Sequence, residues 1–215
     1  MQVAIVTLEG FNELDSFVAM TILGRVDQPD CSVAIASPAP TVASMNGVTV
    51  EVQMSFDDLP AADAVIIGSG TKSREHAADP VVLESLRLDP RRQLIGSQCS
   101  GALMLARLGL LEGLPVCTDS ATRPWAVEAG LDVVERPFSA SGNIATAGGC
   151  MSSQYLATWM IARLCGVDSA RHALRSVAPV GEEDDQVERG LGHVRSTFRS
   201  PSPATAGVRS PVLPT

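Results

Sequence analysis

The sequence has few aromatic residues, few histidines and no excess of basic charge. Phe, Trp and Tyr make up 4% of its 215 residues, too few for the aromatic platforms on which nucleic-acid bases stack. The net charge of −8 argues against binding to the DNA backbone, which requires a basic face. No apolar run is long enough to cross a bilayer. These absences predict a protein that binds neither nucleic acid nor membrane.

The cysteines form no recognised metal or disulfide pattern. There are five of them, and none belongs to a C-x-x-C pair or to a zinc-type spacing. Because their number is odd and no signal peptide is recognisable, we expect reduced thiols and a cytoplasmic location. The segment Gly68-Ser69-Gly70 lacks the third glycine and the acidic partner of a dinucleotide site. The sequence therefore predicts no metal and no organic cofactor.

Short apolar segments alternate with helical ones along most of the chain. Strands are predicted at 2–8, 33–37, 64–67, 93–97, 115–118 and 143–147, with a hairpin or excursion at 48–52. Helices are predicted at 13–26, 80–87, 101–111, 124–129, 151–164 and 169–177. This alternation predicts an α/β fold with a mostly parallel sheet covered on both faces, and ligands at the carboxyl ends of its strands.

The length fits one domain followed by a tail. We expect a single α/β domain over residues 1–190. The tail is expected over residues 191–215, because Ser196–Thr215 is rich in Pro, Ser, Ala and Arg and has no apolar period.

Cys99 stands at an abrupt change of pattern. The apolar strand ends, Cys99-Ser100-Gly101 follows, and a helix begins. This layout is typical of a nucleophile elbow, a tight strand-to-helix turn that exposes a reactive side chain. The partial positive charge of the helix N-terminus would favour a thiolate. The alternative is a buried cysteine that fills space, and these residues alone leave both readings open.

Four motifs stand in an order that is shared with a known superfamily. They are Gly68-Ser69-Gly70-Thr71, Gln98-Cys99-Ser100-Gly101-Ala102, Gly109-Leu110-Leu111-Glu112-Gly113 and Gly142-Asn143-Ile144-Ala145-Thr146-Ala147-Gly148-Gly149. In this order the chain, from Met1 to about Val180, resembles the ThiJ/PfpI superfamily, which is related to class I glutamine amidotransferases. The branch it resembles most is the isocyanide-hydratase-like one. The resemblance implies a flavodoxin-like three-layer sandwich with a cysteine nucleophile elbow, and a homodimer.

The resemblance also implies site residues. Cys99 matches the nucleophile, and Asp15 matches a carboxylate on the first helix beside the sulfur. Gly70 and Ser100 match backbone N–H donors for developing negative charge, and the Ser100 hydroxyl also matches a substrate contact. Thr71 is assigned to the same substrate-binding group.

Each of these assignments has a structural alternative. Asn12 and Asp15 have the spacing of a capping box, in which the carboxylate only satisfies a backbone N–H group. Gly70 fits ordinary turn chemistry, and Ser100 fits an elbow that needs a small residue.

One position departs from the pattern of the protease-like and amidotransferase-like relatives. They carry a histidine where this chain has Asp119, and the three histidines here are His76, His172 and His193. None of these three has a position in the sequence that suits a partner of Cys99. We therefore expect neither a Cys-His protease nor a glutaminase. Asp119 is expected to form a turn or a helix cap, with lining of the site as the alternative.

A thiolate and one carboxyl group suit attack on a small electrophile. The resemblance predicts an isocyanide hydratase, in which the sulfur attacks the terminal carbon, the carboxyl group transfers protons, and water releases an N-formyl amide. A glyoxalase-III or deglycase-like reaction on 2-oxoaldehydes is the enzymatic alternative. The non-enzymatic alternative is a redox or stress sensor whose cysteine becomes oxidised.

Overall fold

A six-stranded sheet forms the centre of the protein, in a computed structural model that describes residues 1–198. The strand order is β2-β1-β5-β6-β10-β9. The bounds are β1 (Gln2–Val6), β2 (Ser32–Ala36), β5 (Ala64–Ile67), β6 (Leu94–Gln98), β9 (Phe138–Ser141) and β10 (Ile144–Ala147). All neighbouring strands are parallel except β9, which runs antiparallel to β10. The predicted mostly parallel α/β sheet is confirmed.

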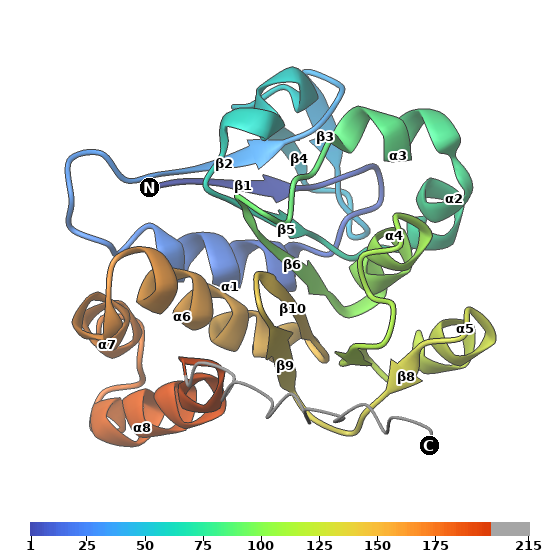
Figure 1. The fold of residues 1–215 in the computed structure, drawn as a ribbon. Coiled ribbons are helices and arrows are strands. Elements are labelled where there is room, and N and C mark those ends of the chain that lie inside the picture. The colour runs from blue at the N-terminus through green and yellow to red at the C-terminus, as the bar shows by residue number, and fades with distance from the viewer. Residues whose placement is uncertain (199–215) are drawn as a thin grey trace, which may run out of the picture.

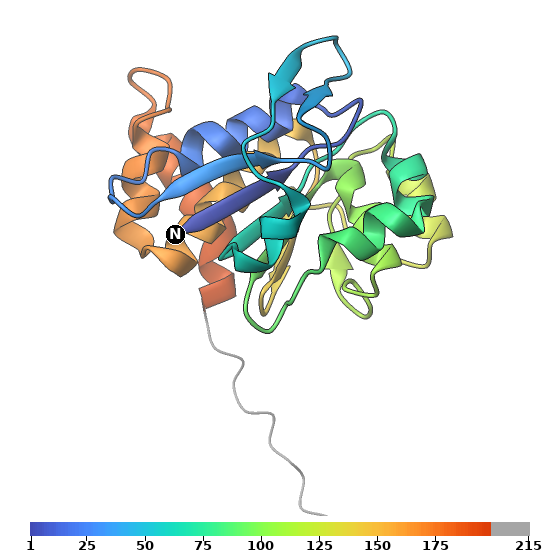
Figure 2. The same ribbon diagram turned by 90° about the horizontal axis from the view of Figure 1, so that it is seen from above.

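Helices cover both faces of this sheet (Figures 1 and 2). On one face lie α1 (Glu13–Leu23), α6 (Ser153–Leu164), α7 (Val167–Arg175) and α8 (Glu183–Val194). On the other lie α2 (Ser73–Ala78), α3 (Pro80–Leu86), α4 (Ala102–Arg107) and α5 (Arg123–Glu128). Alternate residues of β1 enter the two cores, Val3 and Ile5 on the α1 side and Ala4 and Val6 on the α4 side. Burial on both faces explains why the strands are apolar throughout.

Two small ribbons lie outside the central sheet. The predicted excursion around residues 48–52 is a hairpin of β3 (Thr41–Ala43) and β4 (Thr49–Glu51). The strand predicted at 115–118 is short, and as β7 (Pro115–Val116) it pairs with β8 (Asp132–Val133). In the part of the chain that the structure describes, no helix combines the length and the apolarity that a membrane span needs.

The C-terminal helix α8 was not expected from the sequence. It spans Glu183–Val194, so the predicted end of the domain at residue 190 falls inside it, and its Leu191 and Val194 are fully buried in the core beside α6 and α7. A short 3-10 helix, η4 (Arg195–Phe198), follows. The acidic residues of the first turn, Glu183 to Asp185, stabilise α8 through the helix dipole. The rest of the predicted tail, 199–215, lies outside the described residues.

Candidate active site

Cys99 lies directly after β6, at the first position of a 3-10 turn, η2 (Cys99–Gly101), that leads into α4. Its φ angle is +45°, in the left-handed region that non-glycine residues rarely adopt. A residue in this region stores roughly 1–3 kcal/mol of strain, which the surrounding fold must offset. A strained turn between strand and helix is the geometry of a nucleophile elbow, so this prediction is confirmed.

Gly101 permits the turn to pack against the end of β5. A Cβ atom at this position would lie 2.4 Å from the carbonyl oxygen of Ile67, which is closer than any real contact. The start of α4 therefore contacts the neighbouring strand directly through its backbone, and the small residue after Cys99-Ser100 is a steric requirement.

We expect Gly101→Ala to lower the free energy of unfolding by about 1–3 kcal/mol, because the added methyl group forces backbone apart. Gly192→Ala is the matched control, since a Cβ at Gly192 on α8 meets nothing within 4 Å. Urea unfolding measures both variants. An equal loss of stability in the two would contradict the steric role of Gly101.

Asp15 lies in the first turn of α1 and is 1% exposed. Asn12 caps this helix, and its Oδ1 accepts from the Leu14 N–H at 3.0 Å. The Asn12 N–H donates to the Ser69 carbonyl at 2.8 Å, so it does not bind Asp15 as a capping box requires. Instead the Asp15 Oδ2 accepts from the Ser69 hydroxyl at 2.5 Å. Asp15 therefore faces the ends of the central strands.

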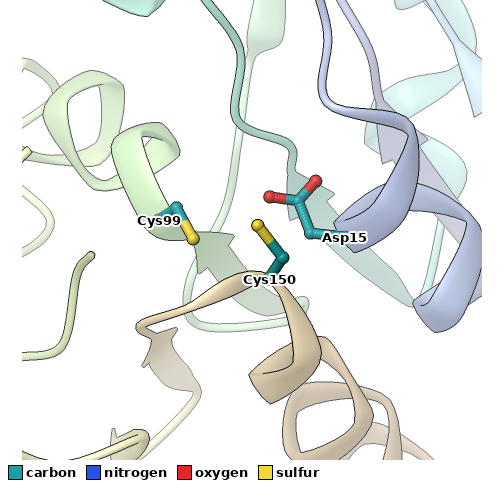
Figure 3. Close-up of side chains that lie close together, drawn as sticks. All are labelled: Asp15, Cys99 and Cys150. Atoms are coloured by element: carbon teal, nitrogen blue, oxygen red, sulfur yellow. The ribbon is translucent and has the colours of Figure 1, made fainter. Parts of the chain in front are cut away.

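Three side chains from separate elements meet at this end of the sheet. Figure 3 shows Asp15 from α1, Cys99 from the elbow and Cys150 from the start of the 3-10 turn η3 (Cys150–Ser152). A carboxylate oxygen of Asp15 and the two Sγ atoms all lie within 4.8 Å of one another. The predicted proximity of Asp15 and Cys99 is thus present in the structure. No role was predicted for Cys150, although the Gly148-Gly149 pair directly before it follows a predicted strand, where ligands were expected.

Burial controls the ionisation of both predicted groups. It raises the pKa of the Asp15 carboxyl to about 7, and the hydrogen bond from Ser69 offsets part of that increase. Burial, and then the negative charge of Asp15, raise the pKa of the Cys99 thiol well above its usual range. Desolvation therefore opposes the thiolate that the partial positive charge of the helix N-terminus would favour. At neutral pH the pair holds a thiol beside a carboxyl group that is poised to exchange protons.

The sulfur of Cys99 is also less accessible than expected. The residue is 3% exposed, and it does not line the large groove of 780 Å³ that runs along α1. Asn12 connects the two features, since it lines the groove and its Nδ2 donates to the Cys150 Sγ at 3.1 Å. The groove is therefore adjacent to the cluster of Asp15, Cys99 and Cys150.

Two of the predicted substrate-binding residues, Gly70 and Ser100, belong to a hydrogen-bond network beside the elbow. The Gly70 N–H donates to the Ser100 Oγ at 3.3 Å, and that oxygen lies 2.8 Å from the Ser73 Oγ. The Ser100 hydroxyl therefore occupies the Gly70 N–H group, which was expected to bind the substrate. Thr71 is exposed, and its hydroxyl donates to the Gly10 carbonyl at 3.4 Å. Their contact with a substrate remains a prediction.

Asp119 forms a turn, as its first interpretation expected. Its Oδ1 accepts from the N–H groups of Ala121 and Thr122, both at 2.9 Å, and its Oδ2 accepts from the Thr122 hydroxyl at 2.7 Å. Its negative charge still raises the pKa of both Asp15 and Cys99. Asp119 thus influences the site through its charge.

The histidines make other contacts. The His76 ring nitrogen lies 3.1 Å from the Glu9 carbonyl, and the His193 ring packs on Tyr155 at a centroid distance of 4.3 Å. The hydrogen bond to the Cys99 Sγ comes from Gln98 Nε2 at 3.5 Å. Within residues 1–198 the partner of the sulfur is therefore a carboxamide, with a carboxyl group close by.

A comparison with known families decides the classification. The sequence profile of the DJ-1/PfpI family matches residues 1–163. The chain belongs to the DJ-1/PfpI family. This confirms the resemblance to the ThiJ/PfpI superfamily.

Relatives of known name and structure agree with this family. The isonitrile hydratase of Pseudomonas putida is 27% identical over 131 residues, which are 60% of this chain and 58% of that protein. Thus the match spans little more than half of the relative's length. Among solved structures, DJ-1 of Schizosaccharomyces pombe has a TM-score of 0.71 at 16% identity, covering 83% of this chain and 100% of that one. A ThiJ/PfpI protein of Pseudomonas syringae has a TM-score of 0.73 at 19% identity, covering 91% and 88%. These structures establish the fold that the chain shares with the DJ-1/PfpI family.

Proposed function

We propose that this DJ-1/PfpI protein is a cysteine-dependent hydratase that converts isocyanides into N-formyl amides. The observation that carries the proposal is a buried carboxyl group with a pKa of about 7 whose oxygen lies within 4.8 Å of the Cys99 sulfur. A group with that pKa can give and take a proton near neutrality, as acid–base catalysis requires. The similarity to the isonitrile hydratase of Pseudomonas putida supports the choice of substrate class.

The first step forms a bond between sulfur and the terminal carbon of the isocyanide. The Asp15 carboxylate takes the proton of the Cys99 thiol as the sulfur attacks. The resulting carboxylic acid then delivers that proton to the same carbon, which gives a thioimidate. In this mechanism the thiol gives its proton to Asp15 only as the sulfur attacks. The reaction is therefore compatible with the high pKa of the Cys99 thiol, because the resting protein does not need a free thiolate.

The second step adds water and releases the product. The Asp15 carboxylate takes a proton from water as the water oxygen attacks the thioimidate carbon, and Asp15 then passes that proton to the nitrogen. As the carbon–sulfur bond breaks, Asp15 takes the proton of the new hydroxyl group and passes it to the Cys99 sulfur, and the N-formyl amide leaves. The net reaction consumes one isocyanide and one water. The Ser100 N–H group is a proposed donor for developing negative charge, and the Gly70 N–H group joins it once the Ser100 hydroxyl that it now binds turns away.

A panel of small electrophiles tests this proposal. The purified protein is incubated with an alkyl isocyanide, an aryl isocyanide and methylglyoxal, and the products are followed by mass spectrometry. We expect the N-formyl amide from the isocyanides and slower turnover of methylglyoxal. Consumption of methylglyoxal alone would replace the proposal with a glyoxalase-like reaction. If no electrophile is consumed while hydrogen peroxide oxidises Cys99, the redox-sensor alternative replaces it.

We also propose that the protein is a homodimer that associates through the groove along α1. Exposed apolar side chains surround this groove, namely Leu14, Met45, Val48 and Met151. Such a concentration of apolar surface is typical of interaction sites.

Met45→Glu is expected to raise the dissociation constant of the dimer about tenfold or more. Val81→Glu is the control, because Val81 is 74% exposed on α3, on the opposite side of the sheet. Sedimentation velocity over a range of concentrations measures both. A wild-type protein that stays monomeric, or an equal effect of both substitutions, would contradict this interface.

A further inference from the structure

The cluster of Asp15, Cys99 and Cys150 contains one group that the proposed reaction does not use. Cys150 comes from the turn after β10, and its sulfur lies within 4.8 Å of both the Asp15 carboxylate and the Cys99 sulfur. Two thiols and a carboxyl group are all potential metal ligands, and Figure 3 shows one carboxylate oxygen directed toward Cys99. From this convergence we propose that the three residues bind a thiophilic divalent metal ion, with Zn²⁺ as the ion that fits the ligand set best.

An unsatisfied oxygen supports a ligand at this place. The Oδ1 atom of Asp15 is buried and has no hydrogen-bond partner among residues 1–198. Buried polar atoms are almost always paired, so an exception requires an explanation. A cation held between the carboxylate and the two sulfurs would supply the missing partner.

Each of the two sulfurs accepts a hydrogen bond from a side-chain amide. Gln98 Nε2 lies 3.5 Å from the Cys99 Sγ, and Asn12 Nδ2 lies 3.1 Å from the Cys150 Sγ. The Gln98 amide is held in place by the Gly149 carbonyl, which accepts from the same nitrogen at 3.0 Å. Outer hydrogen bonds of this kind orient metal-binding thiolates and stabilise their charge.

The local charge has the sign that a cation would neutralise. The carboxyl groups of Asp15 and Asp119 both disfavour a further negative charge at Cys99. A divalent ion reverses this balance, because it is the largest charge in its site.

The ligand types select the metal. Thiolates favour zinc and other soft ions over Mg²⁺ and Ca²⁺, which prefer sets made of oxygen alone. Zinc–sulfur bonds are about 2.3 Å and zinc–oxygen bonds about 2.0–2.2 Å long, so ligand atoms in a tetrahedral site lie roughly 3.5–3.8 Å apart. The three atoms lie within 4.8 Å of one another, so metal binding would require them to approach by up to about 1 Å. Three protein ligands leave a fourth position for water.

Metal binding would displace the thiol protons and block the nucleophile. Each thiol releases one proton to solvent as its sulfur bonds to the metal, and no electron is transferred. A metal-bound Cys99 cannot attack an electrophile, so the ion would hold the nucleophile in a reversible, inactive form. The site itself does not depend on the proposed hydratase activity.

Cobalt provides the test, because Co²⁺ occupies zinc sites and reports sulfur ligation by its absorption. The reduced full-length protein is titrated with Co²⁺ without oxygen, and Zn²⁺ is then added. We expect one equivalent of Co²⁺ to produce a sulfur-to-metal charge-transfer band in the near ultraviolet, and Zn²⁺ to abolish it. We expect Cys150→Ser to weaken Zn²⁺ affinity about tenfold or more, measured against a chromophoric chelator.

Cys165→Ser is the matched control, since Cys165 is a free cysteine at the C-terminal end of α6, where its Sγ lies 3.6 Å from the Met1 Sδ. Its Co²⁺ spectrum and Zn²⁺ affinity are expected to equal those of the wild type. Circular dichroism checks that both variants are folded. The absence of the charge-transfer band in the wild type, an unchanged affinity in folded Cys150→Ser, or an equal loss in Cys165→Ser would each overturn the proposal. None of these outcomes depends on turnover of an isocyanide, so they are distinct from a failure of the hydratase proposal.

Discussion

Cys99→Ser is expected to lower turnover of an isocyanide by roughly 10³-fold or more, because it removes the nucleophile. Serine has nearly the shape of cysteine, so the positive φ angle and the packing at the elbow are retained. A hydroxyl is a far weaker nucleophile than sulfur, and the hydrogen bond to this side chain comes from the carboxamide of Gln98. Initial rates at saturating isocyanide measure the effect.

A second readout links the loss to the sulfur itself. Intact-protein mass spectrometry after rapid quenching is expected to show a substrate adduct on Cys99 in the wild type and none in Cys99→Ser. Cys165→Ser is the control and is expected to keep both rate and adduct. A Cys99→Ser protein with more than a tenth of the wild-type rate would remove the basis of the proposed mechanism.

Asp15→Asn is expected to lower the same turnover by about 10²–10⁴-fold, the usual contribution of general acid–base catalysis. The amide fills the same volume and can still accept the Ser69 hydroxyl bond, but it cannot carry a proton between sulfur, substrate and water. In the wild type, activity is expected to change with an apparent pKa near 7, the pKa of the buried Asp15 carboxyl. This titration should be absent from the residual activity of the variant.

The same substitution is expected to stabilise the fold at neutral and alkaline pH. Burial raises the pKa of Asp15 from 3.8 to about 7, so the folded protein binds this proton more tightly than the unfolded chain does. The free energy of unfolding therefore falls as the pH rises from about 4 to about 7. Above pH 7 the buried charge destabilises the fold by up to roughly 4 kcal/mol.

Urea unfolding of the wild type and Asp15→Asn at several pH values measures this effect. The variant should be the more stable protein above pH 7, and the difference should vanish below about pH 4. A variant that loses both activity and stability at pH 8 would show that Asp15 serves the fold, as a capping carboxylate would.

The fold was largely predictable from the sequence, because buried parallel strands are apolar on both faces and therefore easy to recognise. The segments of β1, β5 and β6 stand out as short apolar runs, and each is found close to its predicted position. The helix α8 was missed, although Val187, Leu191 and Val194 repeat at helical spacing. Its acidic first turn and its two glycines concealed that period. Packing against α6 and α7 supplies the stability that the local sequence lacks.

The candidate site was predictable to a lesser degree. The elbow at Cys99 is a local pattern of strand, small residues and helix, and it could be recognised directly. Asp15 was chosen through a family resemblance, because its own neighbours fit a helix cap equally well. Ser69 and Cys150 had no local signal for their roles. Their side chains reach the site because separate strand ends meet at one edge of the sheet.

The sequence by itself determined the apolar parallel strands of the sheet and the location of the sharp turn at Cys99, since both depend on residues that are neighbours along the chain. The tertiary structure decided which groups surround the sulfur and how they ionise. Asp15 and Cys150 stand 84 and 51 positions away from Cys99, and packing alone brings them within 4.8 Å. Burial of the packed protein, which no local pattern records, raises the pKa of Asp15 to about 7 and makes the pair able to exchange a proton.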